Sequence, residues 1–78
     1  MAETRTERWY AAHYDAHGEL VLSAAMGTSN EVGRMMDRDP ERYRERLAVI
    51  EQGTARTLVR AQRTPSGEYK FRKGPRLS

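Results

Sequence analysis

The amino-acid sequence predicts an α+β fold in the order ββ-αα-ββ, in which two β-hairpins form a four-stranded antiparallel sheet with one or two helices packed on one face. Near each end of the chain, runs of strand length flank a loop that contains glycine. Between the hairpins, a capping pattern and apolar residues at helical spacing predict the helices. The 78 residues form one small domain, 1–78, whose polar ends 1–6 and 74–78 are expected to be frayed tails.

The first hairpin is predicted from residues 8–14 and 19–25, which are rich in aromatic and aliphatic side chains. Gly18 suits the left-handed residue that follows a type I turn, which places Glu19 opposite Asp15. One face of this hairpin then carries Tyr10, Ala12, Tyr14, Leu20, Leu22 and Ala24. The other face carries Trp9, Ala11, His13, Val21, Ser23 and Ala25. In this register we expect Trp9 to stay partly exposed, whereas the alternative, a slip of one residue, would move the whole Trp9 set onto the face of Leu20 and Leu22.

Two helices are predicted in the middle of the chain. Thr28–Glu31 has the capping-box pattern that opens a first, short helix. Pro40 interrupts this helix and is favoured at the first position of a second helix, which we expect from about Pro40 to Gln52, with Gly53 as its stop. The first helix places Val32, Met35 and Met36 on one side, and the second has an apolar stripe of Tyr43, Leu47, Val49 and Ile50.

The second hairpin repeats the geometry of the first. Strands near 55–63 and 68–73 flank the turn 64–67, where Pro65 suits the second turn position and Gly67 the bulge. The matching register turns Val59, Ala61, Tyr69 and Phe71 toward the core, with Arg63 and Lys73 at the ends. It turns Arg56, Leu58, Arg60, Gln62, Lys70 and Arg72 outward.

The positive charge of the chain is concentrated in its last third. The net charge is +3 overall, but residues 53–78 carry seven basic side chains against one acidic side chain. A local excess of this kind predicts a binding surface, and arginine suits bidentate contact with phosphate or carboxylate groups. Codon bias in a GC-rich genome is the alternative source of so much arginine.

No arrangement of residues in the sequence indicates catalysis, a cofactor or a metal. The chain has no cysteine, and His13 and His17 fall on a strand and a turn, where a spacing of four does not bring two rings together. Ser23, His13 and Asp15 lack the setting of a nucleophile elbow. Gly27–Ser29 lacks the Gly-Lys-Ser/Thr ending of a phosphate-binding loop, and helix capping explains it. We therefore assign no catalytic, cofactor-binding or metal residues.

The leading hypothesis is a non-enzymatic interaction protein that occupies a surface of a protein or nucleoprotein complex. Its expected contact residues are Arg56, Arg60, Lys70, Arg72, Lys73 and Trp9. Phage-type inhibitors or regulators of nucleic-acid-handling complexes, such as anti-CRISPR proteins, are built at this scale. Direct DNA or RNA binding through the basic hairpin is the alternative, and a small toxin-type ribonuclease is the third reading, ranked lowest because no acid/base pair stands out.

The same composition sets expectations for the cellular environment. No segment approaches the roughly 18 apolar residues that a membrane span needs, and the chain has no cysteine. We therefore expect a cytoplasmic protein with no membrane partner and no small-molecule substrate.

Overall fold

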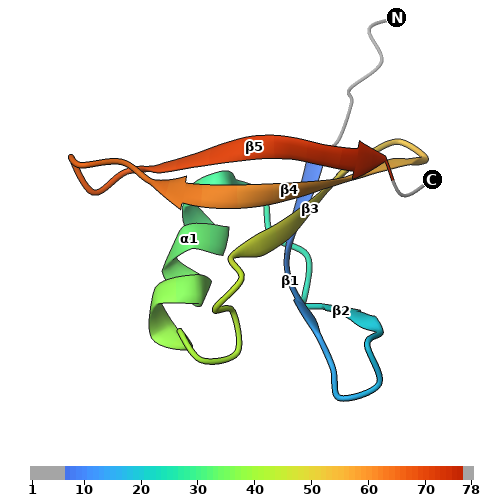
Figure 1. Cartoon of the computed structure of the whole chain (residues 1–78). Helices are drawn as coiled ribbons and strands as arrows, with labels where there is room; N and C mark the ends of the chain where they lie inside the picture. The colour runs from blue at the N-terminus through green and yellow to red at the C-terminus, as the bar shows by residue number, and fades with distance from the viewer. Residues whose placement is uncertain (1–6, 77–78) are drawn as a thin grey trace, which may run out of the picture.

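The computed structural model describes residues 7–76, with side chains described for residues 7–72, and has the predicted α+β architecture. This part of the chain contains one antiparallel sheet of five strands and a single helix. The elements are β1 (Glu7–Tyr14), β2 (Leu20–Leu22), α1 (Ser29–Arg38), β3 (Leu47–Gln52), β4 (Ala55–Arg63) and β5 (Tyr69–Arg76), and the strand order is β2-β1-β3-β4-β5. The sheet twists so strongly that β4 and β5 run nearly crosswise to β1 (Figure 1).

The two predicted hairpins are confirmed, including their turns. In the first hairpin, the Asp15 N–H donates to the Glu19 carbonyl at 2.9 Å, and Gly18 has a φ of 77°. In the second, the matching bond from Thr64 N–H is 2.7 Å, and Gly67 has a φ of 89°. Such positive φ values favour glycine, which is why this residue marks both turns.

The sheet has five strands where four are predicted, and two of the predicted strands end at different residues. β2 covers only Leu20–Leu22, after which the chain returns to β1 through an isolated bridge between Met26 and Trp9. β5 continues to Arg76, beyond the predicted end at residue 73, and a register shift separates Thr57 from Val59 where it pairs with β4. The remaining parts of the predicted tails, residues 1–6 and 77–78, lie outside the described residues.

α1 is the predicted capping-box helix. The Thr28 hydroxyl accepts a hydrogen bond from the Glu31 N–H at 3.3 Å, so the cap occupies one of the free donors at the helix start. The helix buries Val32 and Met36 against the sheet. Within the described residues, no helix is long and apolar enough to cross a membrane.

The predicted second helix, from about Pro40 to Gln52, is wrong. Residues 40–45 form turns, and Arg46 has a left-handed φ of 54°. Leu47–Gln52 is then the central strand β3, paired with β1 on one side and β4 on the other. A central strand with apolar side chains on both faces shows no polar alternation, so its short apolar run cannot be told from a helix by periodicity.

Apolar side chains gather on both faces of the sheet. The face under α1, here called the helix face, holds a buried cluster of Trp9, Ala11, Val32, Met36, Tyr43, Ala48, Val59 and Ala61. The opposite face, here called the open face, holds Ala12, Leu47 and Val49, with the half-buried Tyr10, Leu20, Leu22 and Leu58 packed against them. These faces match the predicted registers of both hairpins.

The expected exposure of Trp9 is wrong. Its side chain lies in the helix-face cluster with only 9% of its surface exposed. The ring meets Phe71 edge to face at 5.0 Å between centroids, and the indole N–H donates to the Glu7 carboxylate at 2.8 Å. The register was predicted correctly, but α1 packs over the side of the sheet that carries Trp9.

Gly33 lets α1 approach β5 closely. A Cβ at this position would stand 2.9 Å from Cδ2 of the Tyr69 ring. The ring cannot move aside freely, because its hydroxyl donates to the Asp37 carboxylate and the guanidinium groups of Arg46 and Arg63 lie over it at 5.8 and 5.7 Å. The absence of a side chain at Gly33 therefore sets the helix-to-strand distance.

We predict that Gly33→Ala destabilises the protein by about 1 kcal/mol, because overpacking costs typically about 1–3 kcal/mol and outweighs the helix-propensity gain of up to about 1 kcal/mol. Urea denaturation measures the change. In a Tyr69→Ala background the clash is gone, so the same substitution should become stabilising. A Gly33→Ala variant that is more stable than the parent protein would contradict the close-approach role.

We predict that Trp9→Ala lowers the free energy of unfolding by about 3–5 kcal/mol, the cost of truncating a large core side chain. Denaturant unfolding, followed by far-ultraviolet circular dichroism because the tryptophan is lost, measures it. Val21→Ala on the exposed edge of the same hairpin is the control and should cost well under 1 kcal/mol. A small effect at Trp9 would mean that the residue is not a core side chain.

Candidate functional site

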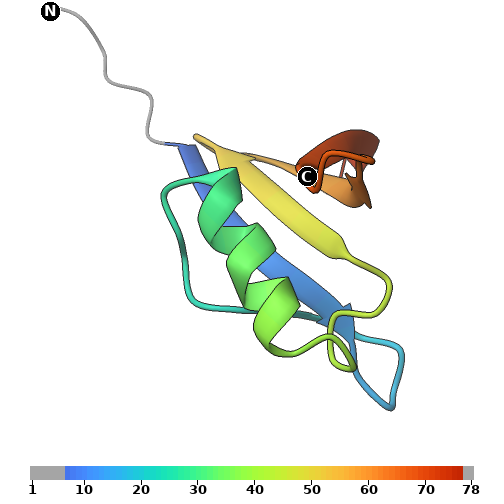
Figure 2. The same ribbon diagram turned by 90° about the vertical axis from the view of Figure 1, so that its left-hand side faces the viewer.

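The open face is the surface of the sheet that α1 leaves uncovered. Figure 2 shows α1 lying along β1 on one side only, so that no helix of the described chain packs on the other side. The center of the open face is apolar: Val49 and Leu47 are 0% and 4% exposed because neighbouring side chains of the same face surround them. The half-buried side chains packed around them, Tyr10, Leu20, Leu22 and Leu58, are the apolar surface that a partner could contact without unfolding the domain.

A pair of arginines borders this apolar area. Arg60 on β4 and Arg72 on β5 are directly opposite each other in the strand register, and both are exposed. The next pair on the same face is Gln62 and the exposed Lys70. Among the described residues none of these three cations forms an ion pair. Like charges opposite each other destabilise a sheet, so the pair costs the isolated protein stability and suits the binding of an anion.

The apolar area and the arginine pair are continuous across the sheet. The strand registers align Ala12 on β1 with Leu47 on β3, Leu47 with Arg60, and Arg60 with Arg72. One row of neighbouring residues therefore passes from the apolar center to the cationic border. Ala12 and Leu47 themselves are buried, so the apolar surface that a partner could contact beside the arginine pair is formed by the half-buried side chains packed around them, Tyr10, Leu20, Leu22 and Leu58.

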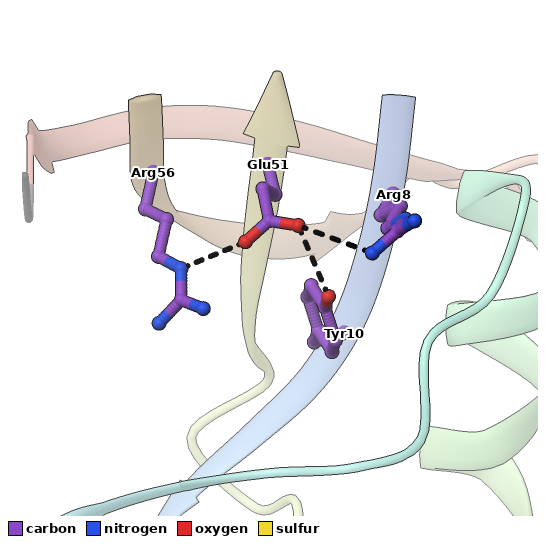
Figure 3. A network of polar contacts seen from close by, with 4 residues as sticks. All are labelled: Arg8, Tyr10, Glu51 and Arg56. Carbon is purple, nitrogen blue, oxygen red and sulfur yellow. Dashed lines mark hydrogen bonds and ion pairs between the residues drawn. The ribbon is translucent and has the colours of Figure 1, made fainter. Parts of the chain in front are cut away.

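Arg56 has a different role from the other predicted basic contacts. Its Nε donates to the Glu51 carboxylate at 2.9 Å, and the same carboxylate accepts a hydrogen bond from the Tyr10 hydroxyl at 3.2 Å and pairs with Arg8 at 3.8 Å (Figure 3). The bond from Arg56 is the main reason that the pKa of Glu51 lies below its ordinary value of 4.5, although partial burial opposes the shift. This cluster holds β1, β3 and β4 together at one end of the open face.

The structure brings together only some of the predicted contact residues. Arg60, Lys70 and Arg72 form one exposed group. Arg56 lies on the same face but is paired with Glu51, and Trp9 is buried on the helix face. The side chain of Lys73 falls outside the described side chains, while its backbone lies opposite Val59.

Sequence reasoning missed the apolar half of the open face. Leu47 and Val49 were placed on a helix, so they were not recognised as the apolar center of this surface. The outward position of Leu58 carried the available signal, because a leucine among the basic residues on the solvent side of the predicted second hairpin indicates an uncovered apolar surface. Glu51 carried no such signal, since its partners come from two other strands, β1 and β4.

The histidines occupy separate environments. The His13 ring meets Tyr43 edge to face at 5.6 Å between centroids, and its Nδ1 is buried without a hydrogen-bond partner among the described residues. His17 lies exposed in the first hairpin turn. Within the described part of the chain, no group of three or more His, Cys, Asp or Glu side chains could hold a metal ion.

The depressed pKa of Glu51 predicts a specific loss of stability in acid. Its stabilising contribution is fully present above 4.5 and is lost as the pH falls through the lower pKa of the folded state. Glu51→Gln should therefore be less stable than the parent protein at about pH 7, with the difference closing toward about pH 3. Urea midpoints across this range measure it.

Glu45→Gln provides the control for this experiment, since Glu45 is exposed and has no ion pair within the described chain. Its difference from the parent protein should vary little with pH. If the stability difference between Glu51→Gln and the parent protein is just as independent of pH between 7 and 3, then Glu51 is not held as an anion by its arginines.

The geometry described here supports binding by complementarity of charge and apolar surface. A scan of the sequence against protein-family models found no match, and searches of curated proteins and of solved structures found none either.

Proposed function

We propose that this chain is a non-enzymatic interaction protein whose open face docks on a protein partner with an acidic surface around an apolar center. The observation that supports this most strongly is that Arg60 and Arg72, exposed and opposite each other at the border of the half-buried apolar area, form no ion pair with any described residue. Protein interfaces combine an apolar center with a polar rim in this way. In the isolated protein, repulsion between the two arginines costs stability. Acidic groups of the partner would remove this repulsion, so its relief adds to the free energy of binding.

An apolar center favours a protein partner over nucleic acid. Phosphate backbones are bound through charge, and single-stranded bases are bound by stacking on exposed aromatic rings. Tyr69 and Phe71 of the basic hairpin belong to the helix face, away from Arg60 and Arg72. On the open face, the hydroxyl of Tyr10 is tied to Glu51, whose negative charge would repel a phosphate.

The narrower form of the proposal is an inhibitor or regulator that blocks a surface of a nucleic-acid-handling complex. Such a role requires a docking face and no catalytic group. The half-buried Leu58 and Leu22, together with the exposed Arg60 of the same face, offer a face of this kind within a very small domain.

Charge reversal on the open face tests the proposal. In Arg60→Glu/Arg72→Glu, the rim would repel an acidic partner, so we expect partner capture to fall at least 100-fold while the free energy of unfolding changes by less than about 1 kcal/mol. Arg34→Glu/Arg38→Glu makes the same change in net charge on exposed positions of α1 and is the matched control. The control variant should keep full capture.

Capture is measured with a photo-crosslinking residue in place of the exposed Gln62, next to the arginine pair, and in place of Arg34 on α1. In an extract of the cells that encode the protein, the substitution at Gln62 should give a discrete protein adduct that nuclease treatment does not remove. The adduct should disappear after charge reversal. A nucleic-acid adduct, or equal adducts from both positions, would contradict the proposal.

A further inference from the structure

A second charged site lies on the helix face, between α1, the following loop and the hairpin β4–β5. It is a surface hollow of about 350 Å³. Its lining consists of Met36, Asp37, Pro40, Tyr43, Arg44, Arg46, Arg63 and Tyr69. Three arginines and a single carboxylate therefore surround one small volume, beside apolar and aromatic walls.

The arginines of the hollow are not neutralised within the described part of the chain. Arg46 and Arg63 lie over the Tyr69 ring, at 5.8 and 5.7 Å from its centroid, and no ion pair connects either of them to a carboxylate. Arg44 also has no ion pair there, and it borders a neighbouring hollow that contains Glu41 as well. The stacking on Tyr69 orients two guanidinium groups without satisfying their hydrogen-bond donors.

The backbone fixes one of these arginines in an unusual conformation. Arg46 has a φ of 54°, the left-handed region that residues other than glycine rarely adopt. Its N–H donates to the Tyr43 carbonyl and its carbonyl accepts from the Ala61 N–H, both at 2.8 Å. These two bonds hold the loop against β4, so the side chain of Arg46 starts from a rigid position at the rim of the hollow.

We propose that this hollow binds a phosphate monoester whose ester group is apolar or aromatic. The lining residues carry a net charge of +2, from three arginines and Asp37, and a phosphate monoester carries close to two negative charges at neutral pH. Three guanidinium groups offer more donors than the two oxygens of a carboxylate can accept, whereas a phosphate presents three terminal oxygens. Met36 and Pro40 supply an apolar wall for the ester group.

Asp37 forms an internal hydrogen bond and no ion pair with the described arginines of the hollow. Its carboxylate accepts a hydrogen bond from the Tyr69 hydroxyl. This bond is the main reason that the pKa of Tyr69 lies above its ordinary value of 10.0, so the phenol remains neutral and adds no negative charge to the hollow. The carboxylate still repels a dianion through space, so removing its charge should strengthen the binding of phosphate.

The test is a nuclear magnetic resonance titration of the full chain with phenyl phosphate, with inorganic phosphate and benzyl alcohol as separate arms. We expect saturable shifts at Arg46, Arg63 and the Tyr69 ring with phenyl phosphate, weaker binding of inorganic phosphate and none of the neutral alcohol. Equal binding of phenyl and inorganic phosphate would remove the apolar part of the proposal. Shifts that are spread over the whole molecule without saturation would overturn it.

Matched variants separate the site from general charge attraction. Arg63→Gln should weaken phenyl phosphate binding about tenfold, the loss of a charged hydrogen bond, whereas Arg60→Gln removes the same charge from the open face of the same strand and should change it less than about twofold. Asp37→Asn keeps an acceptor for Tyr69 but removes the negative charge, so it should tighten binding.

Equal losses in the two arginine variants, or weaker binding in Asp37→Asn, would overturn the site. The Arg60–Arg72 pair plays no part in this inference, so either proposal can fail without the other.

Discussion

A sheet of five strands has two faces, and a single helix can cover only one of them. α1 has ten residues, which span about 15 Å of helix. A domain of this size has only a small core, and this one has no disulfide to compensate for it. The apolar residues of both faces must therefore be removed from water. The rest of the molecule follows from how each face meets this requirement.

On the helix face, α1 packs closely against the sheet and covers the apolar residues. Gly33 lets α1 sit directly against Tyr69, and Tyr43 from the loop fills the space that the short helix cannot reach. The open face uses twist and neighbouring side chains instead. Tyr10 and Leu58 flank Val49 in the strand register and shelter it, while the Glu51 cluster holds the end of the sheet together. The open face is consequently stable but incompletely covered, and we propose it as the surface on which a partner docks.

Local sequence signals identified the parts of the fold that depend on local geometry. The glycines at positions 18 and 67 and the cap at Thr28 each satisfy a backbone requirement within a few residues, so both hairpins and α1 could be predicted. β3 could not, because its identity as a strand depends on pairing with β1 and β4, which are distant in the sequence. The arginine pair was predicted from the hairpin register, whereas the hollow around Tyr69 depends on how the misassigned segment packs.

Paramagnetic relaxation of side-chain methyl groups by a soluble probe tests the role of the open face most directly. In the free protein, we expect the methyls of Leu22 and Leu58 to relax faster than that of Met36, which α1 buries against the sheet. In the complex with the captured partner, Leu22 and Leu58 should become protected while the exposed positions of α1 remain accessible. Protection of α1 with no change at the two leucines would contradict the assignment of the open face as the docking surface.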